Sequence, residues 1–149
     1  MVLISMFKDL FEDLKRRSED NVENNQTIQR IDKKTSGFQD ESWKNIKVGQ
    51  VIKVNKNERF PADLILLKSS DPSGIAYVET MSLDGETNLK HKQAVADMQE
   101  AILSPADAST MTGTVYCDEP NDQLYDYKGI MKVQVRNSSY SYSYDLDYN

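Results

Sequence analysis

One stretch of this sequence places a carboxylate beside a glycine, just after a run that favours a β-strand. It reads Val78-Glu79-Thr80-Met81-Ser82-Leu83-Asp84-Gly85-Glu86-Thr87-Asn88-Leu89-Lys90. Gly85 has no side chain to stop another surface from approaching, and Glu86 follows it directly. A loop of this kind can present a general base, because a base must come within hydrogen-bond reach of the proton that it accepts. Glu86 is therefore the candidate catalytic residue.

The neighbours of Glu86 are expected to support it. Asp84 would repel a phosphate group, so we expect it to cap the turn or to contact a partner domain. Gly85, Thr87 and Asn88 are expected to shape the loop and to allow docking. Taken alone, the motif also suits a simple solvated turn, since Asp-Gly is a strong turn signal. An autonomous hydrolase with Asp84 and Glu86 as an acid–base pair is disfavoured, because neighbours on one turn lack opposed placement.

Composition limits the fold and the function. The chain has 149 residues, of which 38% are hydrophobic, and this length suits one domain. A formal net charge of -6 provides no basic field for nucleic acid. With one cysteine, Cys117, and one histidine, His91, the chain cannot form an internal disulfide or a Cys-His zinc cluster. We expect no metal and no cofactor in this chain, and a solvated strand position for His91.

The residue pattern divides the chain into four parts. Residues 1–17 predict an amphipathic helix, which either packs on its own domain or emerges from a membrane as a stalk. Residues 18–42 are polar and predict a tether with one short strand and a turn at Thr35-Ser36-Gly37. Residues 43–135 are expected to form a β domain. Residues 136–149 alternate Ser with Tyr and predict a disordered tail, with an edge strand as the alternative.

Within residues 43–135 the apolar pattern changes to a period of two. Pro and Gly in Ser69–Gly74 predict a tight turn, and thus a hairpin between the apolar runs on either side of it. Ala96–Leu103 predicts a short helix. The predicted strands are 51–54, 64–67, 75–78, 90–95, 113–117 and 125–135. Short strands with helices at the margins indicate a mainly β fold, a sandwich or barrel-like core with an N-terminal amphipathic helix and a short extra helix.

Several motifs, taken in order, resemble one known family. The Asp-Gly-Glu-Thr loop at residues 84–87 resembles the signature loop of the actuator domain in P-type ATPases, in the form found in the phospholipid-translocating, or flippase, branch. Segments on both sides follow the same pattern: Trp43, Ile46, Val48-Gly49, Val51 and Phe60-Pro61-Ala62-Asp63-Leu64 before it, and Cys117-Asp118-Glu119-Pro120-Asn121, Leu124-Tyr125 and Gly129 after it. The resemblance covers residues 1–133 and favours the stalk for the first helix.

The resemblance implies a fold and a role. The fold would be a distorted jelly roll. Glu86 would position and deprotonate the water that attacks an aspartyl phosphate on another domain, a step coupled to lipid flipping. The implied cofactors, ATP and Mg²⁺, would belong to the whole pump. The implied partners are the phosphorylation and nucleotide-binding domains and the membrane helices of the same pump, with an accessory membrane glycoprotein subunit, at the cytosolic face of a membrane.

The chain shows no phosphorylation site of its own. Asp32-Lys33-Lys34-Thr35-Ser36-Gly37 superficially resembles the phosphorylation motif, but an extra lysine breaks the spacing and no buried apolar strand precedes Asp32. We expect Asp32 to be a solvated loop residue. Without this site or a Walker lysine loop, the chain alone is not expected to turn over ATP. The alternative function is a truncated, non-catalytic actuator-like domain, soluble and cytoplasmic, that acts as a structural or protein-binding module.

Overall fold

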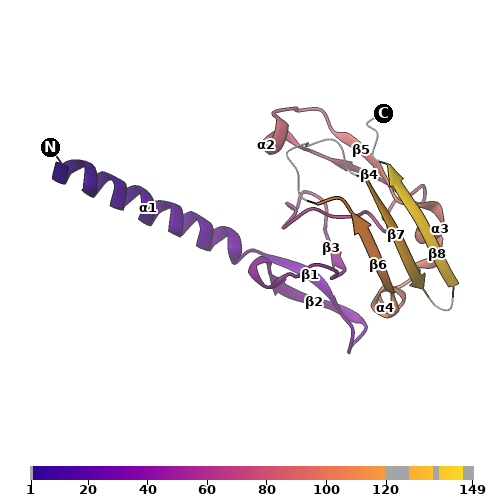
Figure 1. The fold of residues 1–149 in the computed structure, drawn as a ribbon. Helices are drawn as coiled ribbons and strands as arrows, with labels where there is room; N and C mark the ends of the chain where they lie inside the picture. Colours follow the sequence, from indigo (N-terminus) through magenta and orange to yellow (C-terminus); the bar gives the residue numbers. More distant parts are fainter. Residues whose placement is uncertain (1, 120–127, 136–137, 146–149) are drawn as a thin grey trace. The chain divides into compact units, whose positions relative to one another are not determined.

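The computed structural model describes residues 2–119, 128–135 and 138–145, with side chains for residues 6–119 and 129–135. The chain divides into two compact units, residues 1–63 and residues 64–149. Figure 1 shows the helices and strands of both units coloured along the sequence.

The first unit begins with a long helix, α1 (Val2–Asn24). The prediction of an amphipathic helix is confirmed, but α1 continues beyond residue 17. Lys8 pairs with Glu12 at 3.7 Å and Lys15 pairs with Glu19 at 3.8 Å, an i,i+4 spacing that supports a helix. The apolar side chains Phe7, Leu10, Phe11 and Leu14 are exposed. No helix within the described residues is long and apolar enough to cross a bilayer.

Three antiparallel strands follow α1, in the order β2-β1-β3. They are β1 (Thr27–Asp32), β2 (Gly37–Ser42) and β3 (Ile52–Lys53). Ile28 and Ile31 are buried in this small sheet. The polar tether predicted for residues 18–42 is therefore replaced by the end of α1 and a β-hairpin. Two buried isoleucines on β1 and a complete ladder to β2 hold this polar segment in a fixed structure.

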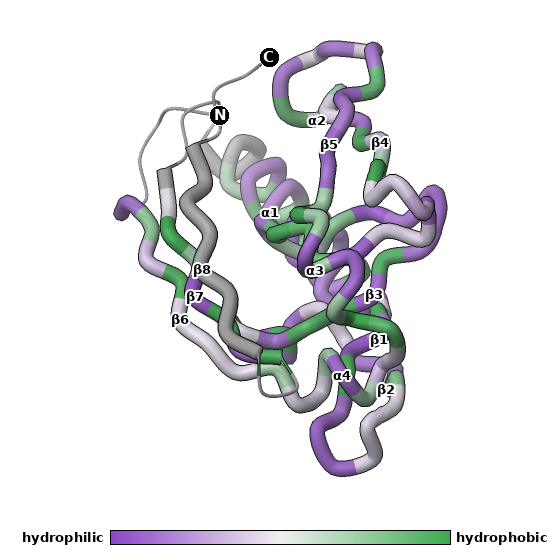
Figure 2. Tube along the Cα trace, turned by 90° about the vertical axis from the view of Figure 1, so that its right-hand side faces the viewer, coloured by the Kyte–Doolittle hydropathy of each residue, from purple (hydrophilic) through white to green (hydrophobic). Residues whose placement is uncertain are grey.

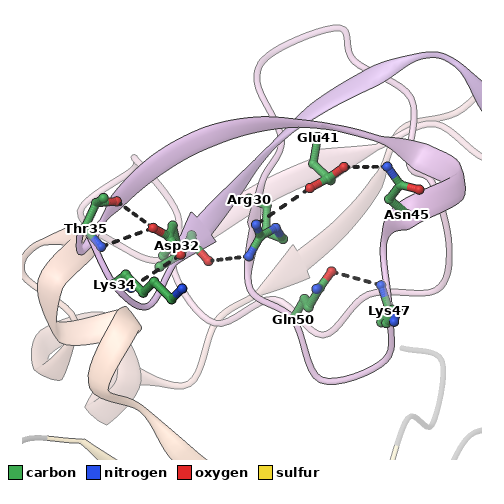
Figure 3. Close-up of polar contacts among 9 residues, drawn as sticks. Arg30, Asp32, Lys34, Thr35, Glu41, Asn45, Lys47 and Gln50 are labelled. Atoms are coloured by element: carbon green, nitrogen blue, oxygen red, sulfur yellow. Dashed lines mark hydrogen bonds and ion pairs between the residues drawn. The ribbon is translucent and has the colours of Figure 1, made fainter.

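The turn between β1 and β2 lies where Thr35-Ser36-Gly37 predicts one. Asp32 ends β1, and its carboxylate accepts hydrogen bonds from the backbone N–H groups of Lys34 (3.3 Å) and Thr35 (3.1 Å) and from the Thr35 hydroxyl (3.0 Å) (Figure 3). Asp32 is thus the last residue of a strand and not a loop residue as predicted. Its carboxylate closes the turn.

Residues 43–63 belong to the first unit and not to the predicted domain 43–135. Trp43 begins a short 3-10 helix, η1 (Trp43–Asn45), and its backbone N–H donates to Gln26 O at 2.8 Å. β3 then pairs with β1 through Gln29↔Lys53 and Arg30↔Ile52. Because these backbone bonds connect the segment to β1, the boundary between the units falls after residue 63.

The second unit contains two sheets. β4 (Ile75–Val78) pairs with β5 (Lys90–Gln93), and β6 (Thr112–Cys117) and β8 (Ser138–Asp145) flank β7 (Lys128–Val135), all antiparallel. These strands confirm four of the predicted β runs, although residues 125–127 of the last run lie outside the described residues. The predicted hairpin between 64–67 and 75–78 is wrong, because residues 64–67 form no strand and β4 pairs with β5.

The turn predicted at Ser69–Gly74 does form, and a glutamine holds its first half. The Gln99 amide accepts from Ser69 N–H at 2.9 Å and donates to Ser69 O at 3.0 Å and Asp71 O at 2.9 Å. Gly74 closes the turn with a φ of +79° and donates its N–H to Asp71 O at 2.9 Å. The backbone of Ser69 therefore bonds to a helix side chain, which holds the start of the turn.

Two short helices cover part of the second unit's core. α3 (Ala96–Ala101) confirms the predicted helix, and α4 (Pro105–Thr110) follows it. Ser104 and Asp107 form a capping box at the start of α4, with Pro105 in the first turn, and these are strong local helix signals. The buried apolar residues of this unit are Ala94, Met98, Ile102, Ala108, Met131, Val133 and Val135, the last three alternating along β7.

The C-terminal segment differs from its prediction. Residues 138–145 form β8, paired with β7 from Lys128↔Asp145 to Val135↔Ser138, where disorder was predicted; residues 146–149 lie outside the described part of the chain. The alternation of Ser with Tyr suits an edge strand. The prediction failed because the partner for this strand lies upstream, where β7 offers an edge. The fold is mainly β with an N-terminal helix and short extra helices, as the sequence predicts.

Candidate functional site: the connection between β4 and β5

The candidate residues lie in the connection between two antiparallel strands. The ladder runs from Ile75↔Gln93 to Val78↔Lys90, so residues 79–89 connect its last pair. Tyr77 and His91 face each other on this ladder, with ring centroids 6.0 Å apart in an edge contact. His91 is an exposed strand residue, as predicted. The connection extends past the ends of both strands and carries both hydrophilic and hydrophobic residues (Figures 1 and 2).

The first part of the connection contains one helical turn, α2 (Met81–Asp84). Gly85 ends this helical turn. Gly85 has a φ of +76° and donates its N–H to Met81 O at 3.0 Å. A residue with a Cβ rarely adopts this left-handed conformation, which explains why glycine stands here. A Cβ at Gly85 would meet no atom within 4 Å, so the backbone is open on that side.

Asp84 is the structural centre of the loop. Its side chain is 4% exposed. The Thr80 hydroxyl donates to its carboxylate at 2.9 Å and 3.0 Å, the backbone N–H of Glu86 donates at 2.9 Å, and the Lys90 ammonium forms a close ion pair. The carboxylate therefore links the first residues of the connection to the start of β5. The predicted roles of Asp84 in capping the turn and in docking remain predictions.

These contacts shift the pKa values of both charged partners. The hydrogen bond from Lys90, followed by that from the Glu86 N–H, holds the pKa of Asp84 well below its usual range. The hydrogen bond to Asp84 raises the pKa of Lys90 above its usual value. Both shifts favour the charged form of the group concerned, as expected for an ion pair.

Glu86 has a very different environment. Its side chain is 57% exposed, against 4% for Asp84, and one carboxylate oxygen lies 3.3 Å from the Lys90 ammonium. The remaining carboxylate surface faces solvent, where it can accept a proton from a water molecule or meet another surface. Two carboxylates two residues apart thus differ in exposure: the Asp84 side chain is nearly buried and the Glu86 side chain is exposed.

The rest of the loop is open to solvent. Thr87 and Asn88 are exposed, and their predicted roles in shaping the loop remain predictions. Three large apolar residues near Glu86 are also exposed: Met81 (52%), Leu83 (61%) and Leu89 (62%).

Sequence reasoning missed two residues of this site, Thr80 and Lys90. The available signal is that Thr80 and Lys90 flank two carboxylates within one short connection. What the sequence could not show is that Lys90 lies opposite Val78 at the end of the ladder, which directs it back to Asp84. Within the described residues, no group of three or more potential metal-ligating side chains is found.

Comparison with known proteins identifies the class of this chain. No family model matches it. It is 40% identical over 139 residues to Phospholipid-transporting ATPase 1 of Arabidopsis thaliana, a match that covers 93% of this chain and 12% of that protein. It is 42% identical over 129 residues to Phospholipid-transporting ATPase IC of Xenopus tropicalis (86% and 10%) and 38% identical over 136 residues to Phospholipid-transporting ATPase DRS2 of Saccharomyces cerevisiae (91% and 10%).

The chain is homologous to one segment of the phospholipid-transporting P-type ATPases, or flippases. This confirms the family resemblance drawn from the sequence motifs. The chain spans about a tenth of the length of the curated relatives that it matches.

Proposed function

We propose that this chain is the actuator segment of a phospholipid-transporting P-type ATPase, and that its Asp-Gly-Glu-Thr loop promotes hydrolysis of the aspartyl-phosphate intermediate. In this role Glu86 is the general base, and Asp84, Gly85, Thr87 and Asn88 shape the loop and allow it to dock. The β strands would belong to the distorted jelly roll of such a domain. The homology over the chain and the geometry of the loop support the proposal.

The observation that carries the proposal is the contrast between the two carboxylates. Asp84 is held by Thr80, Lys90 and a backbone N–H, whereas Glu86 is exposed beside a glycine whose outer side is open. A solvated turn that served only to connect β4 and β5 would need Asp84 and Gly85 but would have no use for Glu86. The exposed apolar residues around Glu86 are available for contact with the domain that carries the phosphate.

The chemistry required of Glu86 is limited. An acyl phosphate is already activated, so the protein must align a water molecule in line with the breaking bond and accept its proton. A positioned base contributes about 10²–10⁴-fold to such a step. The aspartate, ATP and Mg²⁺ would be held by other parts of the pump, which, with the membrane helices, are the proposed partners. In this proposal the segment would lie at the cytosolic face of the membrane.

The proposal is tested in a full-length pump. In Phospholipid-transporting ATPase 1 of Arabidopsis thaliana, the matching segment is replaced by this chain, and the chimera is phosphorylated with labelled ATP. We expect Glu86→Gln to accumulate acid-stable phosphoenzyme at steady state, because formation continues while hydrolysis is blocked. Glu100→Gln is the matched control, since it makes the same change at an exposed glutamate on α3.

A steady-state phosphoenzyme level in Glu86→Gln equal to that of the unmodified chimera would contradict the proposal. It would favour the alternative, a non-catalytic actuator-like module in which the loop serves binding or structure. Accumulation in both Glu86→Gln and Glu100→Gln would also contradict it, because the effect would then not depend on the loop.

A further inference from the structure

Lys90 lies between the two carboxylates of the loop and contacts both. Its ammonium forms a close ion pair with Asp84 and lies 3.3 Å from Glu86 Oε2. The three side chains differ sharply in exposure, at 4% for Asp84, 11% for Lys90 and 57% for Glu86. The cation therefore connects a fixed group to an exposed one.

The position of the Lys90 ammonium is fixed from two directions. Lys90 is the first residue of β5, and its backbone pairs with Val78 at the end of the ladder. Its ammonium is held by Asp84, which is itself fixed by the Thr80 hydroxyl and the Glu86 N–H. A lysine on an open surface would sample many rotamers, but this one has already lost that freedom through burial.

Because the Lys90 ammonium is held in place, its contact with Glu86 can restrict the Glu86 side chain. An ion pair between two exposed side chains has little effect, because both side chains must be ordered to form it. Here only Glu86 has to be ordered, since Lys90 is already held. The contact therefore restricts the rotamers of Glu86 and directs its carboxylate to one side of the loop, while the other carboxylate oxygen remains available to solvent.

We propose that Lys90 is a positioning residue for Glu86, holding its carboxylate in one orientation through the ion pair that links it to the Thr80–Asp84 anchor. This inference rests on the proposed function, in which Glu86 is the base. Lys90 itself would touch neither the water nor the phosphate. Its effect would arise because a misplaced catalytic group loses much of its rate advantage.

The test uses the chimera described above and follows the decay of preformed phosphoenzyme. We expect Lys90→Met to slow decay by about 10-fold to 100-fold, since a misplacement of about 1 Å can cost on the order of 100-fold. Lys90→Arg should restore most of the rate, because it keeps a cation between the two carboxylates. Because Lys90→Met leaves the Asp84 charge unpaired, Asp84→Asn/Lys90→Met is measured as well; it removes both charges and should show the same slow decay.

A decisive readout is the effect of Lys90→Met in a Glu86→Gln background. If Lys90 acts through the Glu86 carboxylate, the second substitution should leave the residual decay rate unchanged within about twofold. An equal slowing in both backgrounds, or the lack of any rescue by Lys90→Arg, would overturn the inference.

The inference can fail separately from the proposed function. Trapping by Glu86→Gln together with normal decay in Lys90→Met and in the double variant would overturn the role of Lys90 alone. Normal decay in Glu86→Gln would overturn the proposed function and the inference with it.

Discussion

Two connections in this chain contain an aspartate that closes a turn, yet they differ in what they leave exposed. In the turn after β1, the Asp32 carboxylate bonds to Lys34 and Thr35, and the chain returns at once into β2. In the connection after β4, the Asp84 carboxylate likewise accepts a backbone hydrogen bond, from Glu86 N–H. The side chain of Glu86 is a second carboxylate, and it stays exposed. The second connection is longer than a hairpin requires.

This difference separates a carboxylate that is held by the loop from one that is left exposed on it. In the β1–β2 turn, the single carboxylate, Asp32, accepts hydrogen bonds that close the turn. In the β4–β5 connection, the Asp84 carboxylate makes the contacts that hold the loop. Glu86 stays exposed next to Gly85, whose backbone is open on one side. A carboxylate on an unsupported loop would have no defined orientation, whereas one next to a buried anchor does. The predictions below compare the two connections directly.

The largest effect on stability is expected from removing the two anchors. Asp84→Ala takes the partner from a Lys90 that is 11% exposed, whereas Asp32→Ala removes hydrogen bonds from an exposed turn. In Asp84→Ala the Lys90 ammonium loses its close ion pair and keeps its longer contact with the exposed Glu86 carboxylate. Weakening the pairing of a largely buried cation costs more than losing a surface hydrogen bond. We expect Asp84→Ala to lower the melting temperature by several degrees, and Asp32→Ala by clearly less. Circular dichroism of the two variants would measure this, and equal shifts would contradict the comparison.

A smaller effect is expected from alanine at the glycine that follows each anchor. Gly85 has a φ of +76°, so Gly85→Ala should cost about 1–2 kcal/mol through left-handed strain. Gly37 begins β2 without positive φ, and a Cβ there lies 3.8 Å from Thr35 Oγ1, an ordinary contact. Gly37→Ala should therefore be neutral or stabilise by about 0.5 kcal/mol. Denaturant unfolding distinguishes the two, and a larger loss at Gly37 would contradict this explanation of Gly85.

The smallest effect is expected in the pH dependence. Native contacts lower the pKa values of both Asp84 and Asp32, so the unfolded state binds more protons in acid. Their stabilisation is present above the unfolded pKa of about 4 and is lost as the pH falls through the native values. Asp84→Asn should therefore flatten the loss of stability below about pH 4 more than Asp32→Asn does. An unchanged acid slope in Asp84→Asn would show that this carboxylate is not held as described.

At alkaline pH the sign is opposite. Contact with Asp84 raises the pKa of Lys90, so its stabilisation is present below the unfolded pKa of about 10.4 and is lost as the pH rises through the native value. NMR titration of the Lys90 side chain would measure this raised pKa directly, and an ordinary lysine pKa would contradict the contact. Lys34, which is exposed in the β1–β2 turn, is the comparison residue.

The sequence predicts elements well where the signal is local. The turns at Thr35–Gly37 and Ser69–Gly74 and most of the strands followed from residue types and periodicity. Strand pairing did not follow, because β4 pairs with β5 across the connection at residues 79–89 and not with residues 64–67 across the nearer turn. The tail at residues 138–145 was misjudged for a similar reason: its partner, β7, is set by tertiary structure.

The sequence predicts some residues of the candidate site but not their exposure or their contacts. Glu86 and Gly85 could be selected from their types and order, but nothing local shows that Asp84 is 4% exposed and Glu86 57% exposed. Nor does spacing alone show that Lys90 contacts both. Those facts depend on the ladder that places Lys90 opposite Val78, a contact between residues twelve positions apart.

The central claim is that Glu86, and not its anchored neighbour, acts on the phosphorylated intermediate. The most direct test is a single-turnover measurement of phosphate release from the phosphorylated chimera with and without Glu86→Gln. We predict release at least about 100-fold slower in Glu86→Gln, the lower end of what a positioned base contributes. Release at the rate of the unmodified chimera would contradict the account.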